Sequence, residues 1–149
     1  MLGFFKKKVV KQMDQIKKFE RKDLAEAAIG AAVLLAAADN GVSDEEVITI
    51  MGLVQNMDQF KHHQSEIETM ITKYTGLLKS GFLVGKITIM REIADVKGNE
   101  EEIEDVLAIA VTIAGADGEF SDKEVALLKE IANKLNFPPS KLAAFGVPA

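Results

Sequence analysis

Cysteine and tryptophan are absent from this 149-residue chain, and tyrosine occurs only once. Without cysteine there is no disulfide framework and no thiolate metal site, so zinc fingers are excluded and a reducing compartment is permitted. Proline is also scarce, with three residues. The hydrophobic fraction of 48% and the charged fraction of 28% are typical of a folded globular chain and argue against disorder. At this length we expect one domain around one core.

The chain also lacks a long hydrophobic run and an alternating apolar and polar pattern. Its longest apolar runs cover residues 27–38 and 106–116, well short of the roughly 18 residues that a membrane-spanning helix needs. Acidic residues bound both runs, so we expect buried core helices. The start of the sequence lacks the apolar stretch of about 7 residues that a secretory signal requires, and we expect a cytoplasmic protein. No segment keeps a period of two, which predicts that there is no sheet.

Charge is divided unevenly along the chain. The net charge is -5, yet residues 1–22 hold eight Lys or Arg against two acids, so the remainder carries -11. An acidic body argues against nucleic-acid binding by the domain. Phe5, Val9, Met13 and Ile16 recur at helical spacing, which predicts a basic amphipathic helix over residues 1–22. This helix either lies on an anionic membrane surface, where each Lys contributes about 1 kcal/mol, or packs its apolar face on the core.

One acidic stretch is present twice. Residues 38–47 read ADNGVSDEEV and residues 116–125 read ADGEFSDKEV. At an offset of 78 residues, nine of nineteen aligned positions around these stretches are identical. Such a match indicates an internal duplication, with repeat units over about 23–58 and 101–136. Each unit reads as an apolar helix, a short acidic turn and a second helix.

Helix starts are marked by capping boxes, in which a cap residue is followed three residues later by Glu. Five such pairs predict at least five helices: Asp23 with Glu26, Ser43 with Glu46, Ser65 with Glu68, Asn99 with Glu102, and Ser121 with Glu124. The second helices of the repeats are expected from Glu45 to about Asp58 and from Lys123 to about Leu135, with further helices near Glu66–Ser80 and Gly85–Lys97. We therefore predict an all-α, single-domain bundle of about seven or eight helices with an internal pseudo-twofold duplication.

The capping boxes leave Asp39 and Asp117 unexplained. Each follows the C-terminal end of an apolar helix, where the helix dipole disfavours a carboxylate by about 0.3 kcal/mol or more. One explanation is an Asx turn, in which each carboxylate accepts backbone N–H groups two or three residues on. The other is a divalent cation shared by the two turns, whose acids are Asp39, Asp44, Glu45 and Glu46, and Asp117, Glu119, Asp122 and Glu124. Ca²⁺ or Mg²⁺ suits such oxygen donors better than Zn²⁺ or Cu²⁺, and both explanations remain open.

Catalytic machinery is not visible in the sequence. There is no Cys, and neither Ser43 nor Ser121 has a His nearby, so nucleophilic catalysis has no apparent base. Two carboxylates are able to act as acid and base, but any acidic cluster offers that pair. We expect a protein that is not an enzyme.

The paired stretches AAADNGVSDEEV and AGADGEFSDKEVALLKEIANKLNF resemble the tellurite-resistance TerB family, and the opening MLGFFKKKV is similar to the start of its free-standing members. The resemblance covers about Asp23 to Phe137, within a TerB-like helical domain expected over residues 23–149. The family pattern is a small-residue helix, then Asp-Gly, then an acidic capped helix. In the first copy Asn40 stands where Gly is usual, and Gly41 comes one residue late.

The resemblance carries expectations for both fold and function. It implies an all-helical fold with a duplicated core and an acidic cluster that binds a divalent cation, for which the matching positions are Asp39, Glu46, Asp117 and Glu124. It also implies work with other tellurite-resistance proteins at the inner face of a bacterial membrane, in resistance to tellurite and related stress. The alternative is a membrane-surface or protein adaptor in which the acidic turns are only helix caps and no metal is bound.

Overall fold

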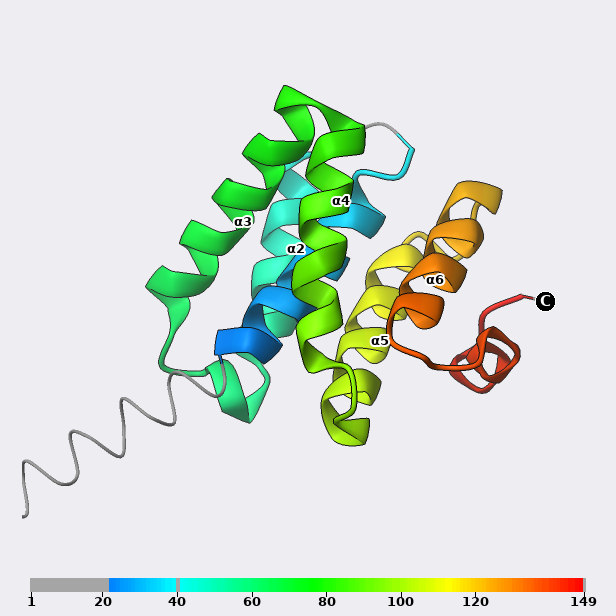
Figure 1. The fold of residues 1–149 in the computed structure, drawn as a ribbon. Coiled ribbons are helices and arrows are strands. Elements are labelled where there is room, and N and C mark those ends of the chain that lie inside the picture. Colours follow the sequence, from blue (N-terminus) through cyan, green and yellow to red (C-terminus); the bar gives the residue numbers. More distant parts are fainter. Residues whose placement is uncertain (1–21, 40, 149) are drawn as a thin grey trace, which may run out of the picture.

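The computed structural model describes residues 22–39 and 41–148, so the helix predicted over residues 1–22 lies almost entirely outside the described part. The α-helices cover residues 22–36, α2 (Asp44–Gln55), α3 (Gln64–Ser80), α4 (Phe82–Ile93), α5 (Glu100–Ala114) and α6 (Asp122–Lys134) (Figure 1). Short 3₁₀ helices occupy Asp58–Phe60, Ala94–Val96 and Pro139–Phe145. No strand occurs in the described part, which confirms the all-α prediction.

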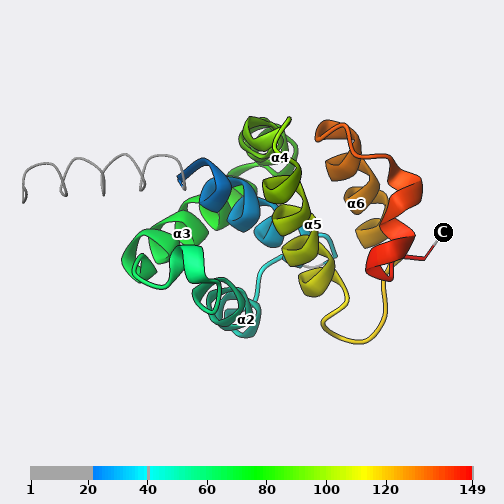
Figure 2. The same cartoon turned by 90° about the horizontal axis from the view of Figure 1, so that it is seen from below.

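The helix over residues 22–36, here called the core helix, is the most deeply buried element. From residue 24 to residue 37 every side chain except Glu26 is buried. Figure 2 shows the core helix in the middle of the bundle, with α4 on one side, α2 on the opposite side and α5 next to it. At Gly30 an added Cβ would lie 2.8 Å from Ile89 Cγ2 of α4, so a glycine is required for this close approach. The run of small residues noted in the sequence is therefore the packing surface of a central helix.

The helix bounds repeat along the chain. The core helix and α5 end 78 residues apart, and α2 and α6 begin 78 residues apart. The helix, turn and helix order predicted for each repeat unit is thus present in the structure. The pseudo-twofold relation between the units remains a prediction. Within the second unit α6 packs on α5, and it also contacts α4.

Two of the five predicted helix starts are wrong. The core helix is already helical at Lys22, so Asp23 lies inside it and is not its cap. α3 begins one residue before Ser65, with His63 at the N-cap position and no side-chain hydrogen bond from that cap. A Ser or Asp caps a helix only when it stands directly before the first helical residue. After the 3₁₀ helix that precedes α3, this position is taken by His63.

The start of α4 also differs from the prediction. We expected this helix from Gly85, but it begins at Phe82, directly after the turn at Gly81. A Cβ at Gly85 would lie 2.8 Å from the carbonyl oxygen of Leu77, so this glycine allows the backbones of α3 and α4 to touch. The glycine marks a close helix contact rather than a helix end. As a result residues 82–84 join the helix.

Candidate functional site

The two acidic turns begin with the same backbone geometry. Ala38 donates its N–H to the carbonyl of Leu35 at 3.3 Å, and Ala116 donates to Ile113 at 3.3 Å. Each turn then uses a glycine with positive φ, +80° at Gly41 and +93° at Gly118, a conformation that side chains with a Cβ rarely adopt. The glycine that arrives one residue late in the first copy therefore still serves the turn.

Reciprocal capping boxes end both turns, as predicted. Ser43 Oγ accepts the N–H of Glu46 at 3.1 Å, and Glu46 Oε1 accepts the N–H of Ser43 at 3.1 Å. The second turn repeats this pair, with Ser121 Oγ accepting from Glu124 at 3.1 Å and Glu124 Oε1 accepting from Ser121 at 2.8 Å. Each box folds its glutamate back over the start of the helix. A third predicted box is one-sided, because Asn99 accepts the N–H of Glu102 but no return bond is recorded.

Apolar residues hold both turns against the core. Val42 and Phe120 each come directly before a cap residue. Val47 and Val125 are the fourth residues of α2 and α6. All four side chains pack partly buried on the core, in the positions of a hydrophobic staple. The Phe120 ring also lies over Gly115, where a Cβ would be 3.0 Å from its Cζ atom. The direction of each turn is thus fixed by packing as well as by hydrogen bonds.

The turns meet at one cavity of about 270 Å³, here called the acidic pocket. All four sequence-predicted residues line it: Asp39, Glu46, Asp117 and Glu124. Its other lining residues come from the same elements and are small or apolar apart from Thr49: Leu35, Ala36, Gly41, Ile113, Ala114 and Ala116. No Lys or Arg is among the described residues that line the pocket. The juxtaposition that a shared site requires is therefore present, whereas metal binding itself remains a prediction.

A hydrogen bond joins the two turns directly. Ser121 Oγ donates to Asp39 Oδ1 at 3.3 Å, across 82 residues of sequence. The same hydroxyl oxygen accepts the N–H of Glu124, so one serine caps α6 and contacts the first turn. From the sequence, Ser121 is expected only to cap α6. Ser43 caps α2 in the same way, but no bond from its hydroxyl to Asp117 is recorded.

Asp117 forms the Asx turn that is one of the two explanations for a carboxylate at this position. Its Oδ1 accepts the N–H of Glu119 at 3.3 Å, two residues on, which is an Asx turn. This bond explains why a carboxylate is tolerated at the end of α5. A carboxylate has two oxygens and about four lone-pair sites, so one such bond leaves capacity for a further donor or a cation.

Burial distinguishes Glu124 from the other acids of the pocket. It is 7% exposed, and among the described residues it is the one charged side chain that is buried. Glu46 is half-buried, and Asp39 and Asp117 are exposed. A buried carboxylate is unfavourable unless hydrogen bonds or an opposite charge compensate it, and the recorded compensation for Glu124 is the N–H of Ser121.

The acids of the pocket are near one another but not tightly clustered. Over residues 22–39 and 41–148, no group of three or more His, Cys, Asp or Glu side chains lies close enough together to hold a metal ion. A cation in the pocket would therefore require side-chain rotations that turn carboxylate oxygens inward. Asp39 and Asp117, which are exposed and sit on turns, have the freedom to make them.

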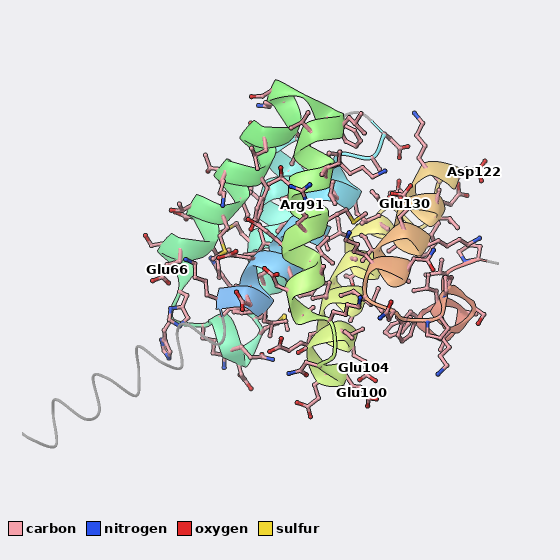
Figure 3. All side chains as sticks on the ribbon, viewed as in Figure 1. Glu66, Arg91, Glu100, Glu104, Asp122 and Glu130 are labelled. Atoms are coloured by element: carbon pink, nitrogen blue, oxygen red, sulfur yellow. The ribbon has the colours of Figure 1, made fainter. Side chains whose placement is uncertain are left out.

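The remaining acids of the repeated stretches lie outside the pocket. Asp44, Glu45, Glu119 and Asp122 are exposed and are not among its lining residues. Figure 3 shows Asp122 at the outer end of α6, pointing away from the bundle. Thr49 lines the pocket and was not predicted, although its place one turn after Glu46 puts it on the same face of α2.

The fold and the site together define a class of all-helical proteins in which two helix, turn and helix units share one acidic pocket. The sequence matches the family model described as "Tellurite resistance protein TerB" over residues 25–146. The chain therefore belongs to the TerB family, as its repeated motifs indicated. No curated protein and no solved structure gave a significant match. Within the described residues, no helix is both long enough and apolar enough to cross a membrane.

Proposed function

We propose that this TerB-family protein is a non-enzymatic interaction module whose acidic pocket binds one divalent cation, Ca²⁺ or Mg²⁺. In this proposal it acts near the inner face of the membrane, together with other tellurite-resistance proteins, in resistance to tellurite and related stress. The observation that supports the cation is the convergence of four carboxylates from both units on one cavity with no basic lining residue among those described.

The electrostatics of the pocket favour a positively charged guest. Like charges that share a partly buried cavity repel each other more strongly than they do in bulk water. A divalent ion with oxygen ligands relieves that repulsion, and the burial of Glu124 raises the benefit. Ca²⁺ accepts six to eight oxygen ligands in flexible geometry, with water completing the set where protein donors are few.

Binding at this place would couple the two repeat units. Asp39 and Glu46 belong to the first unit, and Asp117 and Glu124 to the second, so an ion between them ties the core helix and α2 to α5 and α6. The ion would then also order the carboxylate side chains on the surface formed by both turns, whose backbone is already held by packing and hydrogen bonds. In the proposal this ordered surface is what a partner protein recognises.

Calorimetric titration of the metal-free full chain tests the cation. We expect Ca²⁺ or Mg²⁺ to bind with one ion per chain, and Asp39→Asn or Asp117→Asn to weaken binding by about tenfold or more. Glu45→Gln and Glu119→Gln are matched controls, because each removes a charge from the same turns but outside the pocket. The proposal would be refuted if the native chain released or absorbed no heat of binding at millimolar ion. It would also be refuted if the two Asn variants bound the ion with the same affinity as the native chain.

The second candidate is an adaptor in which the acidic turns serve only as caps. Its support is that each of the four carboxylates already accepts a hydrogen bond, from a backbone N–H or from Ser121. In this case the basic residues 1–22 carry the function by binding an anionic membrane. The expected result is sedimentation with anionic vesicles that is lost at high salt and in a Lys6→Gln, Lys7→Gln, Lys8→Gln variant. Protein that stays in the supernatant at low salt would exclude it.

A further inference from the structure

The corner between α3 and α4 exposes an unusual amount of apolar side chain. Phe82, Leu83, Val84 and Ile87 are 44%, 69%, 70% and 46% exposed. In the described part of the chain the only other large apolar side chain that is exposed is Ile48. Leu83 and Ile87 lie one turn apart on α4, and Val84 lies three residues before Ile87, so they share one face of the helix.

The opposite face of α4 already supplies what the fold needs. Gly85, Ile89 and Ile93 are buried there, and Gly85 touches the backbone of α3. Within residues 22–39 and 41–148, packing therefore does not require the exposed parts of these side chains. Apolar residues gathered on one exposed face mark an interaction surface more often than singly scattered ones do.

The segment that forms this corner is basic, although the domain as a whole is acidic. Residues 69–91 hold four Lys or Arg and no Asp or Glu, in a chain with 23 acids. Lys73 and Lys86 form ion pairs with Glu92 at 3.5 Å and Glu130 at 2.6 Å.

The two remaining cations of this segment flank the apolar face. Lys79 and Arg91 are both exposed, and Figure 3 shows Arg91 on the outward side of α4. Arg91 lies one turn beyond Ile87, and Lys79 lies near the end of α3 beside the turn at Gly81. The first turn of α4 contains no acid, unlike those of α2 and α6, so the helix dipole adds to the positive potential at this end.

We propose that this corner, made of Lys79, Phe82, Leu83, Val84, Ile87 and Arg91, docks on an anionic lipid bilayer. Leu83 and Val84 enter the boundary between headgroups and acyl chains, and Lys79 and Arg91 contact the lipid phosphates. Apolar side chains flanked by basic residues are the features that bind such interfaces, and Glu130, an acid beside this corner, is paired with Lys86. A twofold pair of two copies would place the same cations against each other, which disfavours self-association through this face.

This inference extends the membrane location in the proposed function and assigns it a surface. It does not depend on a cation in the acidic pocket, nor on the part played by residues 1–22. The experiment must therefore report on the corner itself rather than on membrane binding by the whole chain.

The absence of tryptophan makes a local reporter possible. In the full chain Val84→Trp introduces one fluorophore at the corner, and Ile48→Trp introduces one at a side chain of equal exposure, 70%, on α2. With vesicles of phosphatidylcholine and phosphatidylglycerol we expect a blue shift for Val84→Trp and none for Ile48→Trp. With vesicles of phosphatidylcholine alone we expect neither variant to shift.

A second arm removes the apolar contact without a reporter. The double variant Leu83→Ser, Val84→Ser should lower the partition into anionic vesicles by about tenfold, because two side chains no longer leave water. Ile48→Ser should leave the partition unchanged. All three substitutions are at exposed positions, and matching thermal unfolding curves would verify that the fold is kept.

Two results would overturn the proposal. If the protein sediments with anionic vesicles while the Val84→Trp spectrum stays unchanged, another part of the chain carries the binding. If the emission of Val84→Trp shifts in the absence of lipid, and the size of the shift depends on protein concentration, the corner is a contact between protein molecules instead.

Discussion

Glu46 and Glu124 occupy equivalent positions in the two repeats, but they do not have the same environment. Both close a capping box, yet Glu124 is buried and Glu46 is half-buried. α6, which carries Glu124, packs against both α5 and α4, whereas α2, which carries Glu46, packs against α3 and α5. Glu124 is thus the carboxylate of the acidic pocket that is most withdrawn from water.

Two substitutions of Glu124 separate its charge from its capping bond. Glu124→Gln keeps an oxygen that accepts the N–H of Ser121, because Gln also serves in capping boxes. Without divalent ions we expect Glu124→Gln to be at least as stable as the native chain, and Glu124→Ala to lose about 1 kcal/mol. With millimolar Ca²⁺ the native chain should gain stability and Glu124→Gln should not.

Urea unfolding of the native chain and both variants, with and without the ion, measures these differences. A native chain that gains nothing from Ca²⁺, or a Glu124→Gln variant that gains as much as the native chain, would contradict the assigned role of the charge.

Tyr74 gives a pH-dependent contribution to stability. Its side chain is fully buried, and its hydroxyl donates a hydrogen bond to Glu92. Burial raises the pKa of this hydroxyl far above the ordinary 10.0, and the hydrogen bond raises it further. Because the folded chain disfavours the phenolate, the contribution is complete below about pH 10 and is lost as the pH rises above that value. The native chain should therefore be more stable than Tyr74→Phe near neutral pH, by about 1 kcal/mol or more.

The measurement is urea unfolding of both proteins from neutral to alkaline pH. The difference between them should narrow above about pH 10, where the tyrosine of the unfolded native chain ionises. Since Tyr74 is the only tyrosine, its absorbance reports its ionisation directly. A difference that is constant with pH, or tyrosinate absorbance near pH 10 in the folded chain, would show that the phenol is not shielded.

Among the elements, α2 and α6 begin with the same capping box, but only the box of α6 also contacts the other turn. Ser121 donates to Asp39, while Ser43 has no recorded bond to Asp117. The two serines therefore form a matched pair within one protein. Replacing either with Ala should cost about 1 kcal/mol through the lost cap.

A double-mutant cycle isolates the contact between the turns. Ser121→Ala combined with Asp39→Ala should show a coupling free energy of about 0.5 kcal/mol or more in unfolding experiments. The cycle of Ser43→Ala with Asp117→Ala should show none beyond the error of the measurement. Equal coupling in both cycles would mean that the hydrogen bond at Ser121 has no specific effect.

Helix bounds were predictable from sequence where local chemistry sets them. The boxes at Ser43 and Ser121 were correct, because both bonds of each box form between residues three apart. The helix starts predicted from Ser65 and Gly85 were wrong, because local chemistry does not set them. The start of α3 depends on the 3₁₀ helix before it, and Gly85 responds to the backbone of another helix, so neither can be read from a short window of sequence.

The acidic pocket was only partly predictable. The repeated residues named the four acids, and a duplication suggested that the two turns would meet. The bond from Ser121 to Asp39 was not foreseen, because it joins residues 82 positions apart and its equivalent is not seen in the first repeat. The docking corner was not foreseen either, since residues 81–88 alone do not reveal which apolar side chains a neighbouring helix covers.

At the scale of the whole molecule, one small bundle carries two unlike surfaces. The acidic pocket lies where the turns after the core helix and α5 meet, and the basic and apolar corner lies between α3 and α4. A cation bound in the pocket would tie together the two repeat units, and the corner would hold the same bundle on the bilayer. The first of these claims is central, because it explains why the acidic stretch is present twice.

Paramagnetic broadening by Mn²⁺, an ion that prefers the same oxygen donors, tests this central claim most directly. In amide NMR spectra of the full chain, sub-stoichiometric Mn²⁺ should broaden the signals of Gly41 and Gly118 together. The acidic first turn of α5, with Glu100, Glu101 and Glu102, serves as an internal control for non-specific attraction. Joint broadening of both glycines, removed by excess Ca²⁺ or Mg²⁺ and by Asp117→Asn, is the predicted result. Broadening of only one glycine, or stronger broadening at α5 than at either turn, would contradict a shared site.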